Sequence, residues 1–154
     1  MTLSQQIAQH LFDVHEGDNW TDVNLKNTIA NVTWQQAEKI TAASRNSIAA
    51  LLHHIGFYTN VIQQRLEGTD PPINDKNGFD HLAINNDEDW QDLKEECFRA
   101  SNDLVAYLQN YPDDKLFMPV MENKSTAYKS LHGLIEHTHY HLGQIVLIRH
   151  LVQQ

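Results

Sequence analysis

The sequence predicts an all-α protein built as a four-helix bundle. Almost every long segment repeats its apolar residues at three-to-four spacing, and none keeps the two-residue alternation that is typical of a strand. Four of these amphipathic segments are about 13 to 27 residues long, which suits a bundle. Long connections are expected between the first and second helices and between the second and third, and 154 residues suit a single domain covering residues 1–154.

The first helix is predicted over residues 3–15. Its apolar face consists of Leu3, Ile7, Leu11 and Val14, and Gly17 ends it. Further along, Thr33 and Gln36 have the spacing of a capping box, in which each side chain bonds the backbone of the other residue. A short helix from there to about Ile40 is therefore expected.

The second long helix is predicted over residues 44–67, before Gly68 and the pair Pro71-Pro72. The residues expected to face inward are Ile48, Leu52, Ile55, Thr59, Ile62 and Leu66. The connection that follows, residues 68–85, is long, polar and interrupted by glycine and proline. Segments of this kind are usually functional lids or mobile crossovers, and this one is expected to cover one end of the bundle.

The third long helix is expected to begin in the acidic run at residues 86–89, where an asparagine cap and carboxylates suit the positive helix start. Its apolar stripe is Trp90, Leu93, Cys97, Ala100, Leu104, Leu108 and Tyr111, and Pro112 ends it. Because Cys97 lies in this stripe, a packed thiol is expected rather than a nucleophile. The fourth helix is predicted over residues 126–152, capped by Ser125.

Composition and charge exclude several classes of function. Twenty acidic against eleven basic side chains give a formal charge of -9 with no Lys/Arg cluster, which disfavours nucleic-acid binding. No apolar run approaches the roughly 18 residues of a membrane span, and the N-terminus lacks the features of a signal peptide, so no membrane association and a cytoplasmic location are expected. The single cysteine excludes a disulfide framework and any multi-cysteine metal site.

Histidine is the residue type that points to chemistry, since five of the ten histidines lie between His132 and His150. His137 and His141 are four residues apart on one side of the fourth helix, about 6 Å from each other, and can share one divalent ion. That side also carries Ser130, Gly133, Leu134, Gln144, Ile145 and Ile148. This largely apolar surface is expected to face inward, where an unpaired imidazole costs roughly 1 to 3 kcal/mol.

The doublet His53-His54 in the second helix is the natural source of a third ligand. His54 shares its side with Leu51, Tyr58 and Val61, at the margin of the apolar stripe, whereas the side of His53 carries Asn46, Phe57 and Asn60. Periodicity therefore favours His54. Three imidazoles completed by water describe an open, catalytic type of site, and imidazole suits zinc, nickel, copper or iron. The alternative is that each is a hydrogen-bonded core or boundary histidine.

Other polar residues allow two interpretations each. Gln144 follows His141 by three positions and either orients it or packs. Tyr58 lies one turn beyond His54 and either donates to a substrate oxygen or packs with its hydroxyl in water. A different face of the fourth helix carries His132, Glu136, His139 and His150, which are expected to form a polar stripe at solvent or at a subunit contact.

The run His137-Thr138-His139-Tyr140-His141-Leu142-Gly143-Gln144 has the form HxxxHxGQ, and it resembles the signature of the DinB-like superfamily of metal-dependent enzymes. The second helix is also similar to that family, in which a histidine followed by an apolar residue supplies the first ligand. Here His54, followed by Ile55, matches that pattern. The resemblance covers nearly the whole chain in the order and spacing of its helices.

The resemblance implies a DinB-like four-helix bundle in which three histidines hold a divalent metal, commonly as a homodimer and without DNA binding. Relatives include bacillithiol S-transferases and mycothiol-dependent isomerases, so it implies a hydrolase or thiol S-transferase that activates water or a low-molecular-weight thiol for a small-molecule substrate. Zinc or nickel is the expected metal, and iron, manganese and copper are alternatives. The alternative function is a non-catalytic, metal- or small-ligand-binding stress-response bundle.

The fourth helix also gives a hint of self-association. Leu131, Ile135, Leu142 and Val146 lie away from the His137 side, so the helix is apolar nearly all round. Helices of this kind are buried on two sides. A twofold homodimer that uses this second side is expected.

Overall fold

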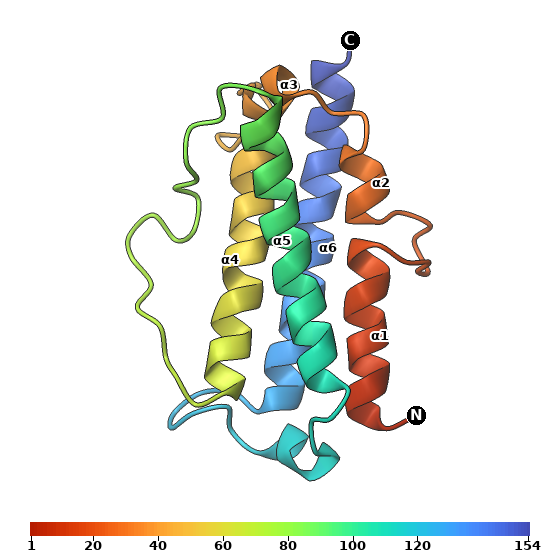
Figure 1. Ribbon diagram of the computed structural model, residues 1–154, viewed down its shortest axis with the longest axis vertical. Helices are drawn as coiled ribbons and strands as arrows, with labels where there is room; N and C mark the ends of the chain where they lie inside the picture. The colour runs from red at the N-terminus through yellow and green to blue at the C-terminus, as the bar shows by residue number, and fades with distance from the viewer.

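The computed structural model describes residues 1–154 and confirms the all-α class, with four long helices and no strand. The helices are α1 (Leu3–His15), α2 (Leu25–Ile29), α3 (Trp34–Glu38), α4 (Ile48–Leu66), α5 (Asp87–Leu108), the 3-10 helix η1 (Asp113–Phe117) and α6 (Ala127–Val152). The long helices α1, α4, α5 and α6 form the bundle, with the two expected long connections between α1 and α4 and between α4 and α5 (Figure 1). None of the helices combines the length and the apolar character that crossing a membrane requires.

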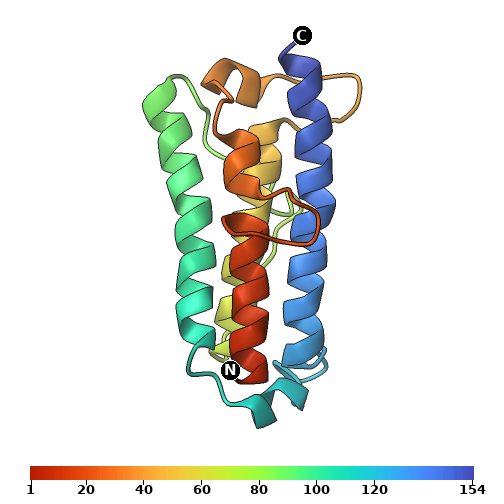
Figure 2. The same ribbon diagram turned by 90° about the vertical axis from the view of Figure 1, so that its right-hand side faces the viewer.

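The four long helices form a square in which α1 and α4 occupy opposite corners. Each of these two packs against both α5 and α6. The short helix α2 lies end to end with α1 and packs against α6 (Figure 2). Since α4 and α6 are neighbours, side chains at the middle of each can meet.

Helices α4 and α5 run in the same direction, which decides the path of the connection between them (Figure 1). A helix of 19 residues, such as α4, is about 28 Å long. The chain from 67 to 86 must therefore return along the outside of the bundle before α5 can begin. The sequence suggested that this connection covers one end of the bundle. Its path instead takes it along the side of the bundle, past the middle of α4.

Side-chain caps set the helix starts. Thr2 and Thr33 each make a complete capping box, the second as predicted. The predicted start of the second long helix at residue 44 is too early, because the Ser47 hydroxyl accepts the Ala50 N–H and caps α4 there. The predicted Ser125 cap is also wrong by one residue, since Thr126 accepts the Lys129 N–H at 3.2 Å.

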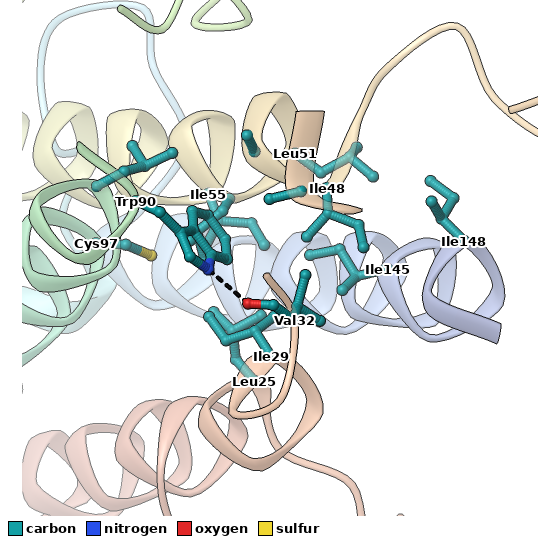
Figure 3. Close-up of a cluster of buried hydrophobic side chains, with 14 of the residues drawn as sticks. Leu25, Ile29, Val32, Ile48, Leu51, Ile55, Trp90, Cys97, Ile145 and Ile148 are labelled. Carbon is teal, nitrogen blue, oxygen red and sulfur yellow. Dashed lines mark hydrogen bonds between the residues drawn. The ribbon is translucent and has the colours of Figure 1, made fainter. Parts of the chain in front are cut away.

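The core forms two apolar clusters, one at each end of the bundle. At the centre of the larger one, the buried Trp90 ring donates its Nε1–H to the carbonyl of Val32 at 2.8 Å, which ties α5 to the connection after α2 (Figure 3). Close by, α4 and α5 approach closely at Gly56, where an added Cβ would lie 3.2 Å from the Cα of Cys97. Cys97 itself is buried, and burial raises the pKa of its thiol to about 12, as suits a packed side chain.

The second apolar side of α6 is used inside the protomer. Leu131, Ile135 and Leu142 are each no more than 2% exposed, because α6 packs against α1 and α2 as well as against α4. The prediction that these three residues form a dimer surface is therefore wrong, whereas Val146, the fourth residue of the predicted surface, is half-buried. A helix in the corner of a bundle is buried on two sides without any partner chain.

Candidate metal centre

His54 lies in the middle of α4 and faces α6. It is 3% exposed, as periodicity predicted for this member of the doublet. The buried residues Leu51 and Ile55 flank it, so the apolar stripe of α4 carries the imidazole into the bundle. A polar ring in this position needs partners from neighbouring elements.

His137 and His141 lie one turn apart on α6 and face the same point as His54. The Nε2 atom of His137 is 2.9 Å from Nε2 of His54 and 3.1 Å from Nε2 of His141. One nitrogen from each ring lies within 4.8 Å of the other two. The structure thus brings together the three histidines that the sequence singled out, from two neighbouring helices.

Two of the three rings are oriented through their Nδ1 atoms. Nδ1 of His54 donates to the carbonyl of Asn77 at 2.7 Å, and Nδ1 of His141 donates to Oε1 of Gln144, also at 2.7 Å. A neutral imidazole has one N–H, so these contacts leave Nε2 of both rings as a bare lone pair. Gln144 therefore orients His141.

The hydrogen bonds between the three Nε2 atoms cannot all be satisfied. His137 can supply one hydrogen at most, and if it sits on Nε2 it must be shared between two acceptors. If it sits on Nδ1 instead, it is buried without a partner, because Nδ1 of His137 has none. In either case lone pairs converge on one point with too few hydrogens between them.

A divalent cation fits this donor set. Imidazole nitrogens bind zinc at about 2.0–2.1 Å, so two nitrogens on one ion are no more than about 4.2 Å apart. Two of the Nε2 separations, 2.9 and 3.1 Å, lie within that limit, and the donor nitrogens of all three rings lie within 4.8 Å of one another. A cation held by all three Nε2 atoms would also satisfy the lone pairs that the protein alone leaves unpaired.

The three imidazoles are neutral at pH 7. Burial lowers the pKa of His54 and of His137 to about 4, and the nearby imidazoles add to this effect. Burial also lowers the pKa of His141. Neutral imidazole is the form that binds a metal, so none of the three rings has to lose an imidazolium proton near neutrality.

Aromatic side chains surround the cluster. The Phe79 ring stacks on His54 with centroids 3.9 Å apart and planes 7° from parallel. The Tyr58 ring lies edge-on to His54 and to His137, and its hydroxyl donates to the side chain of Asn77. Tyr140 lies beside His141, and its hydroxyl accepts from Nε2 of Gln144 at 3.4 Å.

Other predicted residues lie apart from the cluster. His53 is half-buried and donates through Nδ1 to the carbonyl of Gly78 at 2.8 Å, so it belongs to another set of contacts. The predicted polar stripe of α6 is exposed at Glu136 and His150 and half-buried at His132 and His139.

Sequence reasoning missed Asn77, Phe79 and Tyr140. Asn77 and Phe79 come from the connection between α4 and α5, where no periodicity shows which residues turn inward. The one available signal was the pair Asn77-Gly78, a typical tight-turn sequence that holds the chain against α4.

Comparisons with known proteins bear on the family and the fold of the chain. The family model described as the DinB superfamily matches residues 18–145. The chain belongs to the DinB superfamily. No curated protein matches it. A solved structure described as the conserved protein of a locus from Enterococcus faecalis is similar, with a TM-score of 0.74 over 99% of this chain and 98% of that chain.

At 19% sequence identity, the Enterococcus faecalis structure shows that the fold is shared. The DinB-like bundle predicted from the sequence is thus confirmed by both the family match and the structural neighbour. Together with the three-histidine cluster, membership of the DinB superfamily fits a metal-binding role for this chain.

Proposed function

We propose that this DinB-superfamily chain is a metal-dependent enzyme in which His54, His137 and His141 hold one divalent cation. The observation that carries the proposal is the convergence of three Nε2 atoms that the protein alone leaves short of hydrogens. Zinc or nickel is proposed as the metal, with iron, manganese and copper as alternatives, because neutral imidazole suits metals of this class.

The proposed reaction is hydrolysis or thiol S-transfer on a small-molecule substrate. A divalent cation bound by three imidazoles lowers the pKa of water or of a thiol, so that a nucleophile is available at neutral pH. Asn77 and Gln144 keep the Nε2 atoms of His54 and His141 aimed at one point. Phe79 covers one face of His54, which limits the access of water from that side.

Metal content is the first test. The protein, purified without a histidine tag and loaded with zinc, is expected to retain one equivalent after dialysis. His141→Ala should weaken zinc binding by more than the roughly 10- to 100-fold that loss of a residue behind a ligand costs. His150→Ala removes an exposed histidine of the same helix and should bind zinc like the wild type. Wild-type protein without stoichiometric metal would contradict the proposal.

Turnover separates the enzyme from its alternative. The metal-loaded protein is incubated with low-molecular-weight thiols and an electrophile such as a haloarene or an epoxide, and separately with simple esters. Consumption of substrate that disappears in His137→Ala supports a transferase or a hydrolase, according to which substrate reacts. Stoichiometric metal with no turnover on any of these would instead favour the non-catalytic binding bundle.

A further inference from the structure

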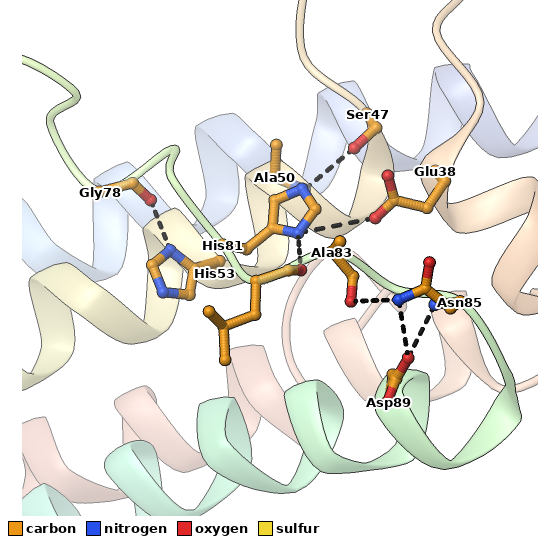
Figure 4. A network of polar contacts seen from close by, with 10 residues as sticks. Glu38, Ser47, Ala50, His53, Gly78, His81, Ala83, Asn85 and Asp89 are labelled. Carbon is orange, nitrogen blue, oxygen red and sulfur yellow. Dashed lines mark hydrogen bonds and ion pairs between the residues drawn. The ribbon is translucent and has the colours of Figure 1, made fainter.

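The connection between α4 and α5 touches the metal centre at one short segment, residues 77–79, which we call the strap. Asn77 and Gly78 both have left-handed backbone conformations, with φ of 54° and 75°. Their carbonyls accept hydrogen bonds from neighbouring residues of α4: Asn77 from His54 at 2.7 Å and Gly78 from His53 at 2.8 Å. Figure 4 shows the His53 ring directed at the Gly78 carbonyl.

Packing leaves the strap little freedom at Gly78. This residue is buried, and a Cβ added there would lie 2.5 Å from Cδ1 of Phe57. Both the positive φ and the close approach require glycine. The strap therefore docks in one position against α4.

That position fixes the ring of His54. An imidazole turns freely about its last side-chain bond over a broad range unless its neighbours prevent it. The strap supplies an acceptor for Nδ1 through Asn77 and a flat partner for the ring face through Phe79. Both contacts are lost if the strap lifts away, and the Nε2 atom of His54 is then no longer held toward His137.

His53 holds the strap without taking part in the histidine cluster. Its hydrogen bond to Gly78 comes from the residue that precedes His54, so each member of the doublet secures one carbonyl of the same turn. The two adjacent hydrogen bonds from His53 and His54 fix both the position and the orientation of the strap. One hydrogen bond alone would leave the strap free to rotate about it.

We propose that His53 is a positioning residue that docks residues 77–79 against α4, so that strap docking and metal binding at His54 stabilise each other. This inference rests on the proposed metal site and adds a coupled element to it. Coupling is reciprocal: if the docked strap raises metal affinity by some factor, bound metal must favour the docked strap by the same factor.

Trypsin gives a direct reading of the strap, because the exposed Lys76 immediately precedes it. The rate of cleavage after Lys76 is followed by mass spectrometry for the metal-free protein and with saturating zinc, and zinc affinity is measured against a competing chelator. Zinc should slow cleavage at Lys76 in the wild type and have no such effect in His54→Ala.

His53→Ala should speed cleavage at Lys76 and lower zinc affinity by roughly 10- to 100-fold, the range seen when the partner of a metal ligand is lost. His53→Asn keeps a donor near the place of Nδ1 and should restore most of both properties, which a purely structural role would not predict. Gly78→Ala should displace the strap through a clash with Phe57 and should therefore have the same two effects as His53→Ala. If His53→Ala does not fold, Gly78→Ala serves as the test variant in its place. His150→Ala should behave like the wild type.

The outcomes separate the two proposals. If the wild type binds zinc and His54→Ala does not, but His53→Ala keeps wild-type affinity, the strap proposal is overturned and the metal site stands. Zinc that binds without slowing cleavage at Lys76 also overturns it. If the wild type binds no zinc, the proposed function fails and the coupling fails with it, while faster cleavage of metal-free His53→Ala would still show that His53 docks the strap.

Discussion

His15 ends α1 in a fully buried position, and its protonation is set by that burial. Its Nδ1 donates to the carbonyl of Leu11 at 2.9 Å, while its buried Nε2 has no partner. Burial lowers the pKa of His15 to about 4, from an ordinary value of 6.5. The folded protein therefore keeps this ring neutral over a range in which the unfolded chain binds a proton.

This difference predicts acid sensitivity with a definite sign. The pKa of His15 is lower in the folded protein than in the unfolded chain. The contribution of neutral His15 to the free energy of unfolding is therefore fully present above pH 6.5 and is lost as the pH falls toward 4. By pH 5 the loss from His15 should be about 2 kcal/mol. Urea unfolding of metal-free wild type and His15→Gln at pH 7.5 and pH 5 measures it. An equal pH dependence in both proteins would contradict this account of His15.

The histidines also show how far the sequence predicts the site. Helical periodicity was sufficient to choose His54 over His53 and to pair it with His137 and His141, because side-chain direction along a helix follows from residue number. Periodicity could not predict the role of Asn77, because this residue lies in an irregular connection and contacts His54 through its backbone carbonyl. A contact made by a backbone carbonyl does not depend on the type of side chain, so the residue type does not predict it.

The four long helices were predicted, although α4 begins later than expected, and of the short helices only α3 was predicted. The limits of α1 agree with the prediction at both ends, because a capping residue and a following glycine mark them. The five-residue helix α2 and the 3-10 helix η1 were missed. A segment of this length shows barely more than one turn of the apolar repeat, so periodicity does not distinguish it from a loop.

Two helix glycines test the packing between elements. At Gly56 the α4–α5 contact leaves no room, so Gly56→Leu should destabilise the fold by roughly 1–3 kcal/mol through overpacking. At Gly133 on α6 an added Cβ meets nothing within 4 Å, so Gly133→Ala should stabilise it by up to about 1 kcal/mol. Chemical denaturation measures both. A destabilised Gly133→Ala or a neutral Gly56→Leu would show that the helix spacing is not as described.

For the assembly of whole chains, we propose a homodimer through the outward face of α6. The apolar residues Tyr140, Leu147 and Leu151 lie on this face and are 65%, 54% and 40% exposed. They follow a helical repeat, so they form one stripe that a second copy can cover by twofold symmetry. This stripe replaces the buried residues that the sequence suggested.

Light scattering at micromolar concentration should give twice the 17.7 kDa mass of one chain. Leu147→Asp should shift the protein toward the monomer, because it places a charge in the proposed interface. Leu82→Asp alters a leucine that is 90% exposed elsewhere, and it should leave the mass unchanged. A monomeric wild type, or a dimer indifferent to Leu147→Asp, counts against this interface.

Anomalous diffraction from zinc-soaked crystals, recorded on both sides of the zinc absorption edge, tests most directly whether three imidazoles share one cation. A single strong peak is expected about 2.0–2.1 Å from the Nε2 atoms of His54, His137 and His141. A peak only at exposed histidines such as His150, or none within reach of the three Nε2 atoms, would contradict the metal centre.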